Sequence, residues 1–247
     1  MITLTTAPVA PLLTRLFEEA DAASPAADPS MADLFQDHDR LMCSKTEYLG
    51  FYERLKDFPL PVSRETGMLL YLLARGSGAR TIVEFGTSFG ISTLHLAAAL
   101  RDNGGGRLIT SEFEPSKVAR ARANLTTAGL IDLVEIREGD ALQTLSADLP
   151  ETIDLLLLDG AKALYPDILG LVESRLRPGA FILADNADYS PDYLARVRAA
   201  GSGYLSTPLT EEVELSVRAA EAQPRKSRRS PGAIGGFFAS GKDKDQV

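Results

Sequence analysis

Two acidic side chains, an amide and a lysine follow strongly apolar runs of the sequence. Asp159 comes after four consecutive leucines and precedes Lys162 by three positions, and Asp185 and Asn186 follow a second apolar run. Three oxygen ligands of this kind suit a hard octahedral cation such as Mg²⁺ better than zinc. Burial beside such a cation should lower the pKa of Lys162, as a proton acceptor requires. The alternative is that these carboxylates cap helices or face water.

A glycine-containing turn follows an earlier apolar run. Glu84 and Gly86 precede Ser88, and Ser92 lies at the start of a predicted helix. Glycine lets a backbone approach a ligand closely, and a helix start offers N–H groups to an anion. A dinucleotide site would need glycine in place of Ser88, whereas an acid before the glycine suits the ammonium of an amino acid. A turn needed only for packing is the alternative.

Two further strand ends carry acids. Glu112 follows the second apolar run and can accept both hydroxyls of a ribose, a feature of NAD and S-adenosylmethionine sites alike. Asp140 and Ala141 follow the third run, where a carboxylate and a backbone N–H can reach an adenine. A helix N-cap at Asp140 is the alternative there.

A doubly wound α/β fold with a mostly parallel sheet would bring these strand ends to one edge. The predicted strands are Thr81–Phe85, Arg107–Ser111, Val134–Arg137, Ile153–Asp159 and Ala180–Ala184. The predicted helices between and after them are Ile91–Leu100, Ser116–Ala128, Tyr165–Arg175 and Pro191–Ala200. Two closing runs, around Gly203–Leu205 and Val213–Val217, form an antiparallel edge that brings the sheet to seven strands.

The chain divides into three predicted parts. Residues 1–60 form a helical arm or cap, with one helix around Leu12–Ala20 and one or two between Met31 and Leu55. Residues 61–222 form the α/β domain, which opens with a helix after Ser63. Residues 223–247 form a basic, flexible tail.

Composition and charge exclude several classes of protein. The 247 residues are 45% hydrophobic and 24% charged, as in a globular domain, and the single cysteine, Cys43, allows no internal disulfide. Without a signal-peptide pattern or a membrane-length apolar stretch, the sequence predicts a soluble cytoplasmic protein. The net charge of −8 argues against nucleic acid as the main partner, although the tail after residue 224 has six basic and two acidic residues.

Five motifs occur in a characteristic order: E-F-G-x-x-x-G, S-E-x-E-P, G-D-A, L-D-G-A-K-x-x-Y and L-A-D-N. With them, about residues 60–220 resemble the class I S-adenosylmethionine-dependent O-methyltransferases, in the cation-dependent branch of catechol and caffeoyl-CoA O-methyltransferases. The resemblance implies S-adenosylmethionine and a divalent cation, Mg²⁺, as cofactors and a small hydroxylated molecule as methyl acceptor. It also favours a homodimer.

The resemblance assigns roles to individual residues. The residues implied to bind the cofactor are Val62, Glu84, Gly86, Ser88 and Ser92 at its methionine part, Glu112 at its ribose, Phe113, Asp140 and Ala141 at its adenine, and Asp159. The implied metal ligands are Asp159, Asp185 and Asn186, and the implied general base is Lys162.

The sequence departs from the family in two ways that leave the acceptor open. Gly160 and Ala161 stand where the catechol enzyme has a His-Trp pair, so an aromatic wall is lost. The substrate-binding glutamate of that enzyme has no clear match, although Glu211, Glu212 and Glu214 lie in the general area. Alternatives are a metal-independent methyltransferase on the same fold, a nicotinamide-dependent oxidoreductase, which the glycine spacing disfavours, and a nucleic-acid-binding module that uses the tail.

Overall fold

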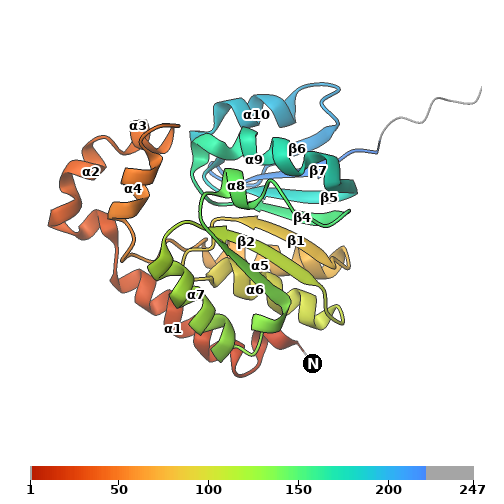
Figure 1. The fold of residues 1–247 in the computed structure, drawn as a ribbon, viewed down its shortest axis with the longest axis horizontal. Coiled ribbons are helices and arrows are strands. Elements are labelled where there is room, and N and C mark those ends of the chain that lie inside the picture. Colours follow the sequence, from red (N-terminus) through yellow and green to blue (C-terminus); the bar gives the residue numbers. More distant parts are fainter. Residues whose placement is uncertain (1, 221–247) are drawn as a thin grey trace, which may run out of the picture.

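A seven-stranded sheet forms the centre of the protein in the computed structural model, which describes residues 2–220 (Figure 1). Its strand order is β3-β2-β1-β4-β5-β7-β6. The strands β1 (Thr81–Phe85), β2 (Arg107–Glu112), β3 (Val134–Glu138), β4 (Ile153–Leu158) and β5 (Leu176–Ala184) are parallel, and β7 (Glu214–Arg218) pairs antiparallel with both β5 and the edge strand β6 (Tyr204–Pro208). The predicted doubly wound fold with an antiparallel edge is confirmed. The predicted tail, 223–247, lies outside the described residues.

The strand register brings the ends of β1, β4 and β5 level with one another. Phe85 pairs with Leu158, and Leu158 pairs with Ala184. The pairing extends one residue further, because the Asp159 N–H donates to the Phe85 carbonyl at 2.8 Å and the Asp185 N–H donates to the Leu158 carbonyl at 2.9 Å. The two acidic residues therefore leave the sheet side by side.

Strand β4 is apolar except for one acid near its start. Its leucines are completely buried, as expected of a central parallel strand. Asp154 instead accepts hydrogen bonds from the backbone N–H groups of Arg80 at 2.7 Å and Thr81 at 2.9 Å. It thus ties the start of β4 to the start of β1 and helps to fix the register.

Helices cover both faces of the sheet (Figure 1). One face packs against α1 (Val9–Ala22), α5 (Arg64–Gly76), α6 (Ile91–Asp102) and α7 (Pro115–Thr127). The other packs against α8 (Ala141–Thr144), α9 (Tyr165–Val172) and α10 (Pro191–Arg198). Helix α5 begins after Ser63, as predicted, because the Ser63 hydroxyl accepts the backbone N–H of Thr66 at 3.0 Å.

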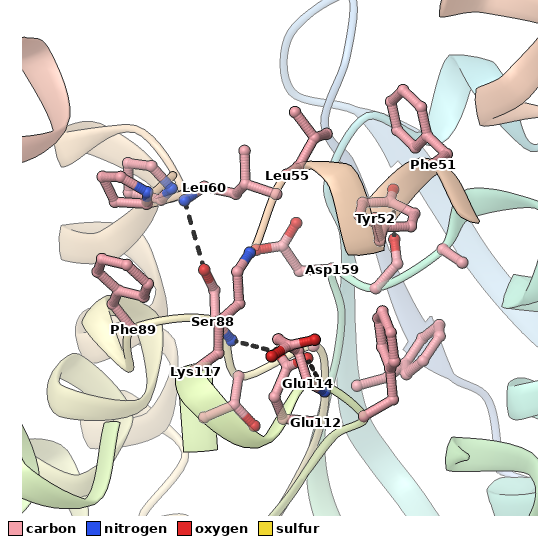
Figure 2. Close-up of a pocket in the computed structure, with 18 of the residues that line it drawn as sticks. Phe51, Tyr52, Leu55, Leu60, Ser88, Phe89, Glu112, Glu114, Lys117 and Asp159 are labelled. Atoms are coloured by element: carbon pink, nitrogen blue, oxygen red, sulfur yellow. Dashed lines mark hydrogen bonds between the residues drawn. The ribbon is translucent and has the colours of Figure 1, made fainter. Parts of the chain in front are cut away.

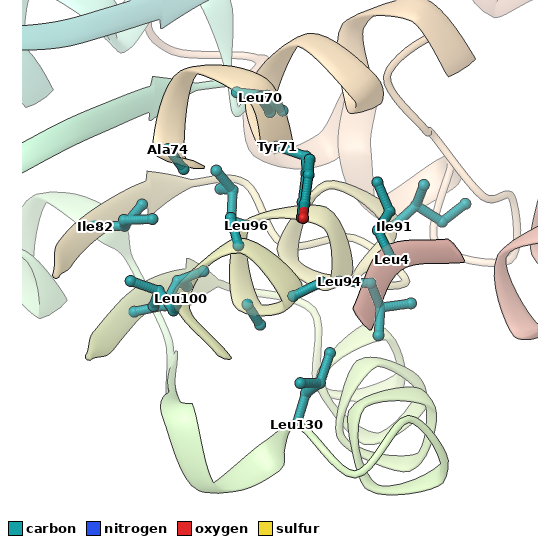
Figure 3. Close-up of a cluster of buried hydrophobic side chains, with 14 of the residues drawn as sticks. Leu4, Leu70, Tyr71, Ala74, Ile82, Ile91, Leu94, Leu96, Leu100 and Leu130 are labelled. Atoms are coloured by element: carbon teal, nitrogen blue, oxygen red, sulfur yellow. The ribbon is translucent and has the colours of Figure 1, made fainter. Parts of the chain in front are cut away.

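The segment before residue 60 packs in two different ways. Its first part belongs to the main core, where Leu4 and the buried face of α1 pack with α5 and α6 (Figure 3). The backbone N–H of Thr3 also donates to Asp102 at the end of α6, at 2.9 Å. Residues 2–22 therefore pack as part of the main core, and the predicted domain boundary at residue 60 stays a prediction.

The second part, residues 31–60, forms a separate unit that we call the lid. It contains three short helices, α2 (Ala32–Gln36), α3 (His38–Met42) and α4 (Tyr48–Arg54), rather than the one or two that the sequence predicts. One break arises where the Ser44 hydroxyl accepts the backbone N–H of Glu47 at 3.1 Å and starts a new turn. The lid has its own cluster of buried side chains, namely Leu34, Leu41, Met42, Phe51 and Leu55.

None of the helices within residues 2–220 has the length and apolar character that a membrane crossing requires.

Candidate active site

A cavity of about 560 Å³ lies between the carboxyl ends of the parallel strands and the lid. This volume is in the range of small-molecule sites. The cavity is lined by eleven of the residues proposed from the sequence, which are Gly86, Ser88, Ser92, Glu112, Phe113, Asp140, Ala141, Asp159, Lys162, Asp185 and Asn186. Val62 and Glu84 do not line it; both are buried.

The proposed metal ligands meet at one end of the cavity. The Asp159 side chain is 12% exposed, and the pKa of Asp185 is raised to about 7, first by burial and second by the charge of the nearby Asp159. Asn186 adopts a left-handed backbone conformation, with φ of 46°. Two crowded carboxylates with a neighbouring amide form a donor set that suits a hard cation.

The third protein ligand of such a site would have to be the amide. Within the described part of the chain, no three histidine, cysteine, aspartate or glutamate side chains come together as a ligand group. A cation here would therefore be held by Asp159, Asp185 and Asn186, with water or acceptor oxygens in the remaining positions.

Lys162 lies in this acidic neighbourhood, but its pKa departs from the expectation. Its Nζ donates to Asp159 Oδ1 at 2.9 Å, and its side chain is only 4% exposed. Burial opposes the charge, yet the nearby Asp159, Tyr165, Tyr52 and Asp185 together raise the pKa of Lys162 well above its usual value. The expected lowering is thus not produced by the protein's own groups, because the ion pair with Asp159 outweighs burial.

Two glycines allow the strand ends to approach one another. A Cβ on Gly86, where φ is +101°, would lie 2.6 Å from the Asp159 carbonyl oxygen. A Cβ on Gly160 would lie 2.4 Å from the ring of Phe85. The Phe85 ring therefore occupies the space beside the position where the catechol enzyme carries a histidine, so an aromatic group is supplied from β1 instead.

Glu112 is held in place by backbone groups. It accepts N–H groups from Ser88 at 2.8 Å and from Glu114 at 3.0 Å (Figure 2). Ser88 can donate because it takes a left-handed conformation, with φ of 47°. A carboxylate fixed in this way keeps lone pairs for ligand hydroxyls, in agreement with the ribose role proposed for it.

Glu84 takes another role from the one proposed. Its carboxylate accepts the hydroxyls of Ser92 and Thr93, both at 2.6 Å, at the start of α6. Burial, only partly offset by these hydrogen bonds, raises the pKa of Glu84 to about 7. The side chain thus faces the first turn of α6 and not the cavity, and the Ser92 hydroxyl is already engaged.

Asp140 combines the two roles that the sequence left open. It caps α8, because its Oδ1 accepts the Leu142 N–H at 2.9 Å. It also lines the cavity with Phe113 and Ala141.

The lid contributes residues that sequence reasoning missed. The Tyr52 hydroxyl donates to the Gly160 carbonyl at 3.5 Å, and His38 stacks on Phe35 with ring centroids 5.5 Å apart. Phe51 meets His38 edge-on at 5.9 Å. The sequence signal for these lid residues was the helical spacing of aromatic side chains between Tyr48 and Leu55. That spacing predicted only that a helix packs there and did not predict that it lines a cavity. Lys117, on α7, was missed as well.

Known proteins resemble this chain in sequence and in fold. A model of a methyltransferase domain matches residues 83–187. A catechol O-methyltransferase of Niastella koreensis is 38% identical over 130 residues, which cover 51% of this chain and 58% of that one, and one of Mycobacterium tuberculosis is 36% identical over 127 residues, covering 51% and 57%. The chain thus spans a little under three fifths of the length of these relatives.

Solved structures agree. An O-methyltransferase of Streptomyces achromogenes involved in tomaymycin synthesis, in complex with S-adenosylmethionine, superposes with a TM-score of 0.60 at 27% identity, covering 76% of this chain and 96% of that one. An O-methyltransferase of Bacillus cereus in complex with S-adenosylhomocysteine gives 0.58 at 26% identity, covering 74% and 96%. The chain is therefore similar in sequence to catechol O-methyltransferases and in fold to S-adenosylmethionine-dependent O-methyltransferases.

Proposed function

We propose that this protein transfers a methyl group from S-adenosylmethionine to a hydroxyl of a small, catechol-like acceptor, with a divalent cation, Mg²⁺, and Lys162 as general base. The observation that carries the proposal is the pair of adjacent buried carboxylates, Asp159 and Asp185, which opens onto the same cavity as Glu112. Such a pair is costly without a cation, since each charge disfavours the other.

Glu112 and its surroundings would hold the nucleoside. The backbone N–H groups of Ser88 and Glu114 fix the Glu112 carboxylate, so it can accept both ribose hydroxyls without reorganising. Phe113, Asp140 and Ala141 line the cavity beyond it and would enclose the adenine.

The acidic end of the cavity would hold the acceptor. When bound there, S-adenosylmethionine supplies an activated methyl group and a divalent cation supplies charge that favours an ionised acceptor hydroxyl. Asp159, Asp185 and Asn186 would hold that cation. Lys162 would take the proton of the acceptor hydroxyl. If Lys162 lost its interaction with Asp159, burial would become the largest effect on the pKa of Lys162. Burial favours the neutral amine, which is the form that can act as a base.

The lid would cover the acceptor. His38, Phe51 and Tyr52 bring aromatic rings to the wall of the cavity, which suits a flat acceptor and excludes water from the reacting atoms.

Isothermal titration with S-adenosylhomocysteine, with and without Mg²⁺, combined with a catechol methylation assay with and without EDTA, tests the proposal. We expect nucleoside binding and methyl transfer that EDTA abolishes and Mg²⁺ restores. Absence of nucleoside binding would refute the proposed activity altogether.

A metal-independent methyltransferase is the second candidate, and one contact favours it. Lys162 Nζ already occupies an oxygen of Asp159 at 2.9 Å, so the acids can be balanced by lysine, with Asp185 and Asn186 as hydrogen-bonding groups. Methyl transfer that continues unchanged in EDTA would support this candidate.

We further propose a homodimer and a cytoplasmic location, as the sequence predicts. Light scattering on the eluted protein tests the first and fractionation of the source cells tests the second.

A further inference from the structure

Two buried lysines line the cavity, and only one of them has a partner. Lys162 is paired with Asp159 at 2.9 Å. Lys117, in the first turn of α7, is only 4% exposed and lines the cavity, yet it makes no hydrogen bond or ion pair with any residue between 2 and 220. Within residues 2–220, the Tyr193 hydroxyl is the only side-chain polar atom that is both sealed from solvent and without a hydrogen bond, so the Lys117 ammonium is open to the cavity, where an anion can pair with it.

The side chain of Lys117 extends from α7 past Ser88 towards the middle of the cavity (Figure 2). Burial is the largest effect on its pKa and lowers it. The negative charges of four carboxylates raise the pKa of Lys117 in the opposite direction, but none of them forms an ion pair with Lys117. These carboxylates belong to Glu112, Glu114, Asp159 and Asp57. The ammonium is thus surrounded by negative charge without being neutralised by any one group.

Two of the groups expected to bind the amino acid part of the cofactor offer no free side-chain donor to its carboxylate. Val62 does not line the cavity, and the Ser92 hydroxyl donates to Glu84. Ser88, beside which Lys117 passes, does line it. A carboxylate placed between the Ser88 turn and the lid would therefore meet Lys117 as its cationic partner.

We propose that Lys117 Nζ binds the α-carboxylate of the methionine part of the cofactor. This inference rests on the proposed function, because it assumes that an S-adenosyl amino acid fills the cavity. It adds a cationic carboxylate-binding residue on the helix after β2, next to the ribose-binding Glu112. A charge-assisted hydrogen bond of this kind is directional and strong, and its loss weakens binding by about 10- to 100-fold.

Two ligands that differ in the amino acid part test the proposal. S-adenosylhomocysteine carries the carboxylate, whereas 5′-methylthioadenosine keeps the nucleoside and the sulfur but has neither carboxylate nor amine. Isothermal titration of each ligand should be compared for the unchanged protein, for Lys117→Met and for Arg122→Met. Arg122 is an exposed residue of the same helix, so its variant loses the same charge outside the cavity.

In Lys117→Met we expect the dissociation constant of S-adenosylhomocysteine to rise about 10- to 100-fold and that of 5′-methylthioadenosine to change by less than about threefold. In Arg122→Met neither constant should change. Retained 5′-methylthioadenosine binding also shows that the variant is folded.

Other results would overturn the proposal. Equal weakening of both ligands in Lys117→Met would mean that Lys117 acts through the nucleoside site, and unchanged binding of both would mean that it contacts no cofactor group. A weakening confined to an acceptor such as 3,4-dihydroxybenzoate, with both nucleosides unaffected, would assign the anion to the acceptor instead. If the unchanged protein bound neither nucleoside, the proposed function would fail together with this inference.

Discussion

The two sides of the cavity are built differently. The strand-end floor carries Asp159, Asp185 and Glu112, which are held by sheet hydrogen bonds or by backbone N–H groups. The lid has a small core of its own and is connected to the floor by few contacts, such as the bond from the Tyr52 hydroxyl to the Gly160 carbonyl. The floor therefore has fixed geometry for a common reaction, whereas the lid can change to suit an acceptor without disturbing the sheet.

The largest expected effect is on the floor. Asp185→Asn keeps the shape of the side chain but removes one of two crowded negative charges, so methyl transfer in Mg²⁺ should fall on the order of 1000-fold. Repulsion with Asp159 is relieved, so the free energy of unfolding should not fall. Rates of methyl transfer measure the first effect, and urea unfolding measures the change in the free energy of unfolding. Asp192→Asn, at an exposed acid of α10, is the control, and transfer at the unchanged rate in Asp185→Asn would contradict the metal role.

The position of Asp185 could be predicted from sequence because its place depends on local pattern. An acid directly after a buried parallel strand must emerge at the carboxyl edge, and the pairing of Leu158 with Ala184 then brings Asp159 and Asp185 together. Glu112 follows the same rule after β2. Strand and helix positions were likewise predictable, with differences of a few residues at most ends; β5 starts at Leu176, four residues before its predicted start.

The remaining features depend on contacts between distant segments. The Glu84 carboxylate points towards the start of α6 because it accepts the hydroxyls of Ser92 and Thr93 there. No sequence pattern within β1 indicates this orientation. His38 lines the cavity only because the lid folds over the sheet. Lys117 lies two residues after Pro115 on a helix whose exposed face is polar, so only the packing of α7 shows that its side chain turns inward.

The second prediction concerns the charge of Glu84, which lies behind the floor, against the start of α6. The pKa of Glu84 is raised from 4.5 to about 7, so the folded protein keeps a proton that the unfolded chain loses. Between these pH values the unfolded state binds fewer protons, and the free energy of unfolding falls as the pH rises, by about 3 kcal/mol in total.

Urea unfolding at a series of pH values measures this dependence. Glu84→Gln, which stays neutral throughout, should lack this component, whereas Glu53→Gln, at an exposed lid position, should retain it. The same pH dependence in Glu84→Gln and in the unchanged protein would show that Glu84 is not the group that titrates.

The third prediction addresses the lid. Phe51 belongs to the lid core and lines the cavity, so Phe51→Ala should raise the KM for catechol about 10-fold through lost apolar contact. Because that core is separate from the main one, the affinity for S-adenosylhomocysteine and the main unfolding transition should change little. Glu53→Ala, at an exposed position of the same helix outside the cavity lining, is the control. A large loss of global stability in Phe51→Ala would mean that lid and floor are one cooperative unit.

The smallest expected effect lies where the lid meets the body. Lys45 pairs with Asp167 of α9 at 2.6 Å, but both side chains are about half exposed, so the pair contributes less than about 1 kcal/mol. Lys45→Met should raise the KM for catechol by less than about threefold at low salt, and the difference from the unchanged protein should disappear at high salt, where the pair is screened. Kinetics at two salt concentrations measure both. A much larger effect at low salt that high salt removes would show that this one ion pair holds the lid closed, and the contrast between a fixed floor and a loosely connected lid would then have to be abandoned.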